Sequence, residues 1–273
     1  MSDDINRIAS HYSTGHLLAR LEAGLAEMGL ALETITAADL KPVDEFHIGG
    51  HAATEALLDQ LTLQAGMRAL DIGCGIGGMA RNLAARGLQV DGIDATPDFV
   101  ETARRLNDGL GIAGCFRTAS ALDLPFEPER FDLVTMLHVG MNIADKPRLF
   151  AEAARVLCNG GTFAVYDVMT DEAGDIVYPL PWAGAPGASH LAPPAAYRFA
   201  AAAAGFALVT ERSRGDFARD FFDRLSAQMA GSGPPSVGLP LIMGADAPRK
   251  IANMVANLKA RRYQPVEMIF RRN

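Results

Sequence analysis

Short apolar runs alternate with segments of helical periodicity through the middle of the chain. The runs predict strands over Met67–Ile72, Leu88–Asp94, Phe131–Leu137 and Gly161–Val168, and a weaker run near Gly114–Arg117 predicts another. Strands that alternate with helices are typical of a parallel sheet with covering helices. The pattern therefore predicts an α/β fold.

Two helix signals lie between these strands. Thr96 and Pro97 are an N-cap followed by a first-turn proline, which predicts that a helix begins there. Lys146–Leu157 carries its large apolar residues on one face and stops at Asn159-Gly160, which supplies a left-handed cap. Both signals fit helices that cross from one parallel strand to the next.

The flanks of this core follow other patterns. Residues 1–45 predict two helices, the second with apolar residues at helical spacing: Leu17, Leu18, Leu21, Leu25 and Met28. The proline- and glycine-rich stretch 171–194 predicts a mobile or lid-like loop. We therefore divide the chain into an N-terminal helical cover (1–45), an α/β core with the lid loop (46–212), a helical insertion (213–264) and a final strand (265–273).

Composition narrows the function classes. The net charge of −7 argues against a nucleic acid partner, and 49% hydrophobic residues suffice for a large core. No run of about 18 apolar residues predicts a membrane span, and the first residues lack the charge and apolar stretch of a signal peptide. Cys74, Cys115 and Cys158 are too scattered for a disulfide framework or a zinc pair. We expect a cytoplasmic protein with reduced thiols.

The segment ALDIGCGIGGMAR places a strand, a glycine-rich turn and a helix in succession. Gly73, Gly75 and Gly78 form a G-x-G-x-x-G pattern that lets backbone N–H groups approach a nucleotide-like cofactor, and by itself it also fits a dinucleotide. Asp71 would repel a pyrophosphate and suits a cationic group instead. Asp94 ends the next strand, where a carboxylate accepts from ribose hydroxyls. Without that role, Asp71 would be a capping or solvated acid and Asp94 a turn residue.

These motifs resemble class I methyltransferases that use S-adenosylmethionine. LDIGCGIGG is similar to their first motif, GIDAT to the ribose-binding acid, and SALDLPFEPERFDLV to the adenine-side loop. FHIGGHAATEALLDQL, HVGMNIADK and ARVLCNGGTFAVYDV are similar to a small-molecule subgroup that includes sarcosine and dimethylglycine N-methyltransferases and the ubiquinone-biosynthesis type. The resemblance covers most of Phe46–Asp167. It implies a Rossmann-like fold with a mostly parallel seven-stranded sheet, helices on both faces, N-terminal helices and a helical lid insertion.

The resemblance also implies which residues bind the cofactor. The methionine part would lie near Asp71, Gly73, Cys74 and Gly75, with its carboxylate near Arg81, and the ribose on Asp94. The adenine and its surroundings would be formed by a set of short side chains and two leucines: Ala95, Thr96, Ser120, Ala121, Leu122 and Leu137. Ser120 replaces the acid usual in the family, so its hydroxyl would hold the adenine with less strength.

The acceptor would be held by aromatic residues and histidines of the flanking segments. Tyr12, His47 and His138 are the candidate catalytic residues, with His138 placed just past a strand at the ligand-binding edge of the sheet. Trp182 would contact the acceptor. Behind it we expect four more side chains, His51, Tyr166, Asp167 and His190. Any of these residues would otherwise serve as a helix cap, a surface residue or lid packing, and no metal site is expected.

The sequence thus predicts a methyltransferase that transfers a methyl group from S-adenosylmethionine to N or O of a small molecule. A nicotinamide-dependent oxidoreductase and a non-catalytic nucleotide-binding module remain as alternatives. A hydroxyl acceptor needs a proton acceptor whereas a neutral amine does not, and the sequence decides neither. The identity of the acceptor and the oligomeric state, for which a homo-oligomer is an option, stay open.

Overall fold

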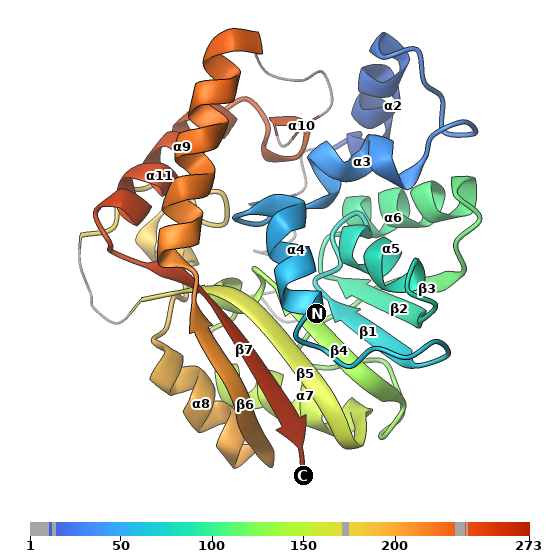
Figure 1. Ribbon diagram of the computed structural model, residues 1–273, viewed down its shortest axis with the longest axis vertical. Coiled ribbons are helices and arrows are strands. Elements are labelled where there is room, and N and C mark those ends of the chain that lie inside the picture. The colour runs from blue at the N-terminus through green and yellow to red at the C-terminus, as the bar shows by residue number, and fades with distance from the viewer. Residues whose placement is uncertain (1–10, 13–14, 171–174, 233–237, 239) are drawn as a thin grey trace.

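The computed structural model describes residues 11–12, 15–170, 175–232, 238 and 240–273. Its centre is a seven-stranded sheet of strand order β3-β2-β1-β4-β5-β7-β6 (Figure 1). All neighbouring strands are parallel except β7, which runs antiparallel to β5 and β6. The strands are β1 (Arg68–Ile72), β2 (Gln89–Asp94), β3 (Gly114–Thr118), β4 (Phe131–Leu137), β5 (Leu157–Met169), β6 (Phe206–Ser213) and β7 (Gln264–Arg272). The predicted α/β class, sheet and strand positions are confirmed.

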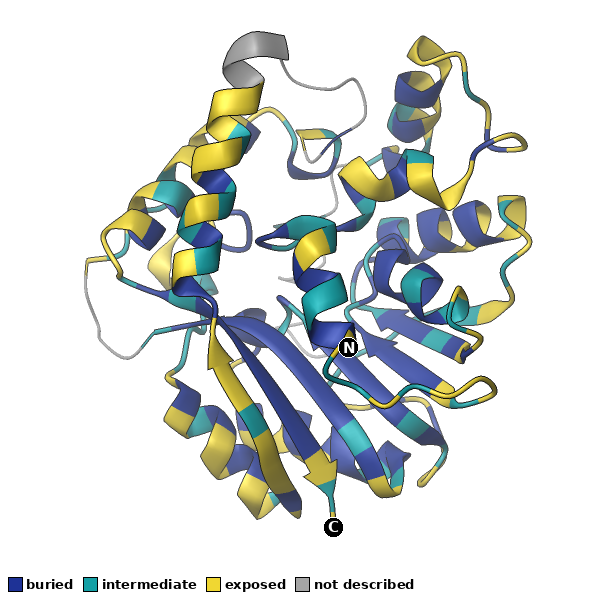
Figure 2. Ribbon diagram, viewed as in Figure 1, coloured by how far each residue is buried: buried dark blue, intermediate teal, exposed yellow. Residues whose placement is uncertain are grey.

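Helices cover both faces of the sheet, as Figures 1 and 2 show. One apolar cluster joins the sheet to α7 (Lys146–Val156) and α8 (Pro194–Ala203). A second joins its other face to α4 (Gly50–Leu58), α5 (Gly78–Ala84) and α6 (Pro97–Gly109). The central strands are buried on both faces because each face carries such a layer.

The remaining helices lie beyond the carboxyl ends of the parallel strands (Figure 1). The N-terminal part contributes α2 (Leu17–Glu27) and α3 (Ala37–Asp44). The C-terminal part contributes α9 (Gly215–Ser232), α10 (Pro240–Met243) and α11 (Ala247–Lys259). Two short 3₁₀ turns, η1 (Gly140–Asn142) and η2 (Pro186–Ala188), complete the elements of the described residues. Strand order reverses between β1 and β4, and ligands of open α/β sheets bind at such a point.

Two features differ from the sequence expectations. Met28 is 48% exposed because α2 ends before it, whereas the other apolar residues of the α2 stripe face inward. The loop expected to be mobile or lid-like is packed in part: Leu180, Trp182 and Ala183 are buried in one apolar cluster with α9 and α11, whereas residues 184–187 are exposed. Proline cannot donate a backbone hydrogen bond to a neighbouring strand, but a proline-rich loop can still be buried. The composition therefore did not show that part of this loop is packed. Residues 171–174 of the predicted lid lie outside the described residues.

Among the described residues, no helix is both long and apolar enough to cross a bilayer.

Candidate functional site

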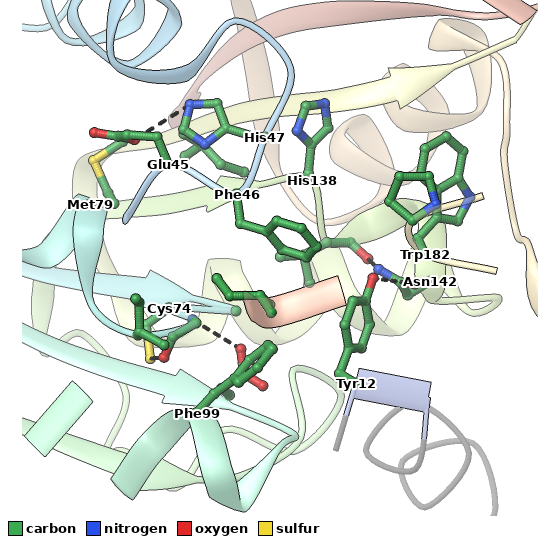
Figure 3. A pocket seen from close by; sticks show the side chains of 18 of the residues that line it. Tyr12, Glu45, Phe46, His47, Cys74, Met79, Phe99, His138, Asn142 and Trp182 are labelled. Atoms are coloured by element: carbon green, nitrogen blue, oxygen red, sulfur yellow. Dashed lines mark hydrogen bonds and ion pairs between the residues drawn. The ribbon is translucent and has the colours of Figure 1, made fainter. Parts of the chain in front are cut away.

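A cavity of about 460 Å³ lies at the carboxyl edge of the sheet (Figure 3). One wall, the glycine-turn side, is formed by the ends of β1, β2 and β4 and by the loops that follow β1, β2 and β3. The opposite wall, the helical side, is formed by residues 46–48, 139–144 and 181–182, by Tyr12 and by α9, α10 and α11. Segments from both ends of the chain therefore enclose the strand ends that carry the predicted cofactor residues.

The glycine turn is held rigidly beside β2. The backbone N–H groups of Gly73 and Cys74 donate to the carbonyl oxygen of Ile93, and Gly75 N–H donates to Asp94 Oδ2 at 3.0 Å. Gly73 has φ 73, and a Cβ there would collide with Val139. Gly75 has φ 53 and open space where a Cβ would stand. Both positions need glycine, and at Gly75 the backbone is open to the cavity.

Asp94 presents a carboxylate with free acceptor capacity to this wall. Its Oδ1 accepts from Thr96 N–H at 2.8 Å, so each oxygen accepts one backbone donor and keeps lone pairs for another. Burial raises the pKa of Asp94, and the backbone donors oppose that shift. Ala95, Ala121, Leu122 and Leu137 line the cavity near it, whereas Thr96 does not.

Ser120 also lines the cavity, and its Oγ accepts from Leu122 N–H at 3.0 Å. This bond fixes the loop after β3 and leaves the Ser120 O–H available as a donor.

Asp71 is a buried acid at the end of β1 with a single partner. Its side chain accepts from the Thr135 hydroxyl at 2.8 Å, and among the described residues this is its only hydrogen bond. Burial raises the pKa of Asp71 to about 7, and the charges of Asp94 and Glu45 act in the same direction. A cation on this wall would relieve that cost.

Arg81 does not reach the cavity, which corrects its expected role beside the cofactor carboxylate. Its guanidinium forms a two-point ion pair with Asp44 and donates to Asn107 Oδ1 at 2.7 Å and to Ile76 O at 2.8 Å. The side chains of Arg81 and Asp44 are 2% and 6% exposed. Arg81 thus fastens α3 to α5, and the sequence could not reveal its distant partner Asp44.

His138 and Tyr166 hold the backbone of Ile48. His138 Nδ1 accepts from Ile48 N–H at 3.2 Å, and the Tyr166 hydroxyl donates to Ile48 O at 2.9 Å. His138 Nε2 is buried without a partner among the described residues, and burial holds the pKa of His138 well below its usual value. Its basic nitrogen is therefore engaged, which argues against the expected proton-accepting role. Tyr166 lies behind the cavity wall rather than on it.

His47 lies on the cavity wall and is connected to a buried acid that the sequence analysis missed. The Thr54 hydroxyl donates to Glu45 Oε2 at 2.7 Å, and its oxygen lies 3.1 Å from His47 Nε2 (Figure 3 shows His47 and Glu45). Because the Thr54 proton is directed at Glu45, the oxygen accepts from Nε2–H and leaves Nδ1 as the basic nitrogen. Burial lowers the pKa of His47, while the charge of Glu45 and a hydrogen bond with the Gly50 backbone act in the opposite direction.

The other candidates divide between the cavity and its surroundings. Tyr12 and Trp182 line the helical side. His51 lies outside the wall, 3.4 Å from Glu45 and 3.8 Å from Glu55, and His190 also lies outside it. Asp167 is buried behind η1 and accepts from the Tyr197 hydroxyl at 2.6 Å. Among the described residues, no group of three potential ligands could hold a metal ion.

Much of the helical side was not identified from the sequence. Its apolar residues on α9 and α11 recur at helical spacing, a pattern that indicates helix packing whether or not a ligand cavity lies beside it. The cavity residues absent from the sequence prediction include Glu45, Phe46, Met79, Phe99, Met141, Asn142, Phe221, Phe222, Leu225, Ile242, Met243, Ile251 and Met254.

Comparisons with known proteins agree on the core. Residues 70–165 match the model of a family described as a methyltransferase domain. The chain is 32% identical over 134 residues to the Methyltransferase GfsG of Streptomyces halstedii, covering 48% of each chain. It is 38% identical over 104 residues to the chloroplastic tocopherol O-methyltransferase of Arabidopsis thaliana, covering 36% of this chain and 29% of the relative. The matched part thus spans about half or less of these relatives.

Two solved structures have a similar fold. The geranyl diphosphate C-methyltransferase of Streptomyces coelicolor A3(2), solved with S-adenosyl-L-homocysteine, has a TM-score of 0.71 and 19% identity, with 100% of this chain and 99% of that chain covered. A structure described as a sarcosine dimethylglycine methyltransferase from Galdieria sulphuraria has a TM-score of 0.65 and 22% identity, with 81% and 85% covered. The fold of the whole described chain is therefore that of class I methyltransferases.

Proposed function

Because the chain belongs to the class I S-adenosylmethionine-dependent methyltransferases, we propose that it transfers a methyl group from S-adenosylmethionine to N or O of a small molecule. The observation that carries this proposal is the glycine turn, which is hydrogen-bonded to Asp94. The backbone of the turn and the carboxylate of Asp94 both face the cavity. Binding of S-adenosylhomocysteine tests it.

The residues of the glycine-turn side fit this cofactor. Asp94 keeps acceptor capacity on both carboxylate oxygens, which suits the two hydroxyls of a ribose. Asp71 is a buried acid that lacks a cationic partner, which suits the ammonium group of the methionine part. Ser120, Ala121 and Leu122 would flank the adenine. The bound cofactor supplies a methyl group already activated on a sulfonium.

The protein must then orient the acceptor, exclude water and, for a hydroxyl acceptor, take up a proton. His47 is our candidate for that proton, since its Nδ1 remains basic while Thr54 and Glu45 hold Nε2. Glu45 lies 3.6 Å from the ring and would stabilise its protonated form. His138 and Tyr166 act as positioning residues that fix the loop carrying His47.

A nicotinamide-dependent oxidoreductase is the weaker candidate. It would place a pyrophosphate at the glycine turn, where the buried acid Asp71 and the nearby Glu45 and Asp94 would repel it. We further propose a reducing, cytoplasmic environment, because Cys74, Cys115 and Cys158 are all unpaired.

Cofactor binding should depend on pH through Asp71. Its pKa of about 7 means that the carboxyl gains a proton as pH falls below 7, and a protonated carboxyl does not attract an ammonium group. We therefore expect the affinity for S-adenosylhomocysteine to fall by up to about tenfold per pH unit below pH 7 and to level off above pH 8. Calorimetry at several pH values measures this, and Asp71→Asn should remove the dependence. A wild-type affinity that stays constant from pH 5.5 to 8 would refute the ammonium contact.

A further inference from the structure

The helical side of the cavity is built almost entirely from large apolar side chains. Trp182, Phe221, Phe222, Ile251 and Met254 line it from three segments that are far apart in the sequence. Phe222 and Met254 are buried, so these two side chains are shielded from bulk solvent. Met141 and Met243 add flexible thioether side chains, which adapt to irregular apolar shapes.

The polar groups of this side are mostly engaged by the protein. Trp182 Nε1 donates to Ser189 Oγ at 3.1 Å, so the indole offers the cavity its apolar ring. His138 is engaged with Ile48. Apart from His138 Nε2, which has no partner among the described residues, Tyr12 and Asn142 are the exception: the Tyr12 hydroxyl lies 3.4 Å from Asn142 Oδ1, a long contact, and Figure 3 shows the two side chains pointing toward one another beside Trp182. A ligand hydroxyl or amine could replace that weak bond.

The helical side also lacks a cation. Among the described residues, Lys41 is the only lysine or arginine on the cavity wall, and it is an exposed residue of α3. Arg214, near α9, stacks on Phe217 and pairs with Glu267 at 2.9 Å, outside the cavity. A carboxylate or phosphate on the acceptor would lose its hydration without gaining a counter-charge.

We propose that the acceptor is a neutral, predominantly hydrocarbon molecule, one hydroxyl or amine of which binds between Tyr12 and Asn142 while its hydrocarbon body lies against Trp182, α9 and α11. This inference rests on the proposed methyltransferase function and names the substrate class of the same site. Two structural neighbours are named for geranyl diphosphate and for sarcosine and dimethylglycine, which are charged molecules. The acceptor proposed for this chain differs from these molecules because it is neutral.

The test uses a matched series of ligands on protein saturated with S-adenosylhomocysteine. Calorimetry with phenol, 4-ethylphenol and 4-butylphenol should show the affinity rising about fourfold for each added methylene, the value for transfer of a buried methylene from water. The anion 4-butylbenzoate should bind at least tenfold more weakly than 4-butylphenol. The inference would be overturned if the affinity did not rise from phenol to 4-butylphenol, or if 4-butylbenzoate bound more tightly than 4-butylphenol. Absence of heat from S-adenosylhomocysteine itself would instead refute the proposed function.

Two variants locate the binding. Tyr12→Phe should weaken 4-butylphenol about two- to tenfold, the usual effect of one hydrogen bond, and leave 4-butyltoluene unchanged because that ligand has no polar group. Phe222→Ala should weaken both ligands. Phe199→Ala is the control, since Phe199 is 74% exposed on α8 and away from the cavity. The assignment would be contradicted if Tyr12→Phe lowered the affinity for both ligands equally. It would also be contradicted if Phe199→Ala lowered these affinities as much as Phe222→Ala.

Discussion

Replacing Asp94 with alanine is expected to weaken S-adenosylhomocysteine binding by about 2–4 kcal/mol. Two hydrogen bonds to a charged acceptor are lost at roughly 1.5–3 kcal/mol each, and water replaces part of them. The same change frees Gly75 N–H and Thr96 N–H, which loosens the turn that presents the backbone to the cofactor. Calorimetry gives the affinity, and thermal unfolding without ligand reports any effect on the fold.

Asp108→Ala is the matched control, because Asp108 is an exposed acid on α6, the helix that follows β2 and Asp94. It should leave the affinity unchanged. A loss of less than threefold in Asp94→Ala, together with a large fall in melting temperature, would show that Asp94 is a structural turn residue.

Arg81→Ala is expected to destabilise the fold by about 3–5 kcal/mol, the usual cost of removing one member of a buried ion pair. Asp44 would remain as a buried carboxylate without its cation, and Ile76 O and Asn107 Oδ1 would lose a donor. For a protein of this size the melting temperature should fall by roughly 6–20 °C. Thermal unfolding of the ligand-free protein measures the change.

Arg105→Ala provides the comparison, since Arg105 is an exposed arginine on α6. Its melting temperature should equal that of the wild type. If Arg81→Ala kept the wild-type melting temperature but bound S-adenosylhomocysteine much more weakly, Arg81 would contact the cofactor after all.

The glycine-turn side could be predicted from the sequence because its residues are local. Asp71 lies near the end of one strand, Gly73 and Gly75 follow it, and Asp94 ends the next strand, so the order of the strands along the chain already places them at one edge. The sheet could be predicted for a similar reason. Parallel strands that are buried on both faces form continuous apolar runs, which are recognised directly in the sequence.

The helical side could not be predicted in this way because distant contacts build it. Tyr12 meets Asn142 across 130 positions, and outside the cavity Arg81 likewise meets Asp44 across 37. A stripe such as Phe221 and Leu225 looks the same whether it covers a core or a ligand cavity. His138 was placed correctly at the end of β4, but its contact with Ile48 depends on a loop 90 residues away.

The central claim is tested most directly by calorimetry of the wild-type chain with S-adenosylhomocysteine and, separately, with NADH. We expect saturable binding of S-adenosylhomocysteine with one site per chain and no heat from NADH, because Asp71 suits an ammonium group and repels a pyrophosphate. Tight binding of NADH without heat from S-adenosylhomocysteine would contradict it.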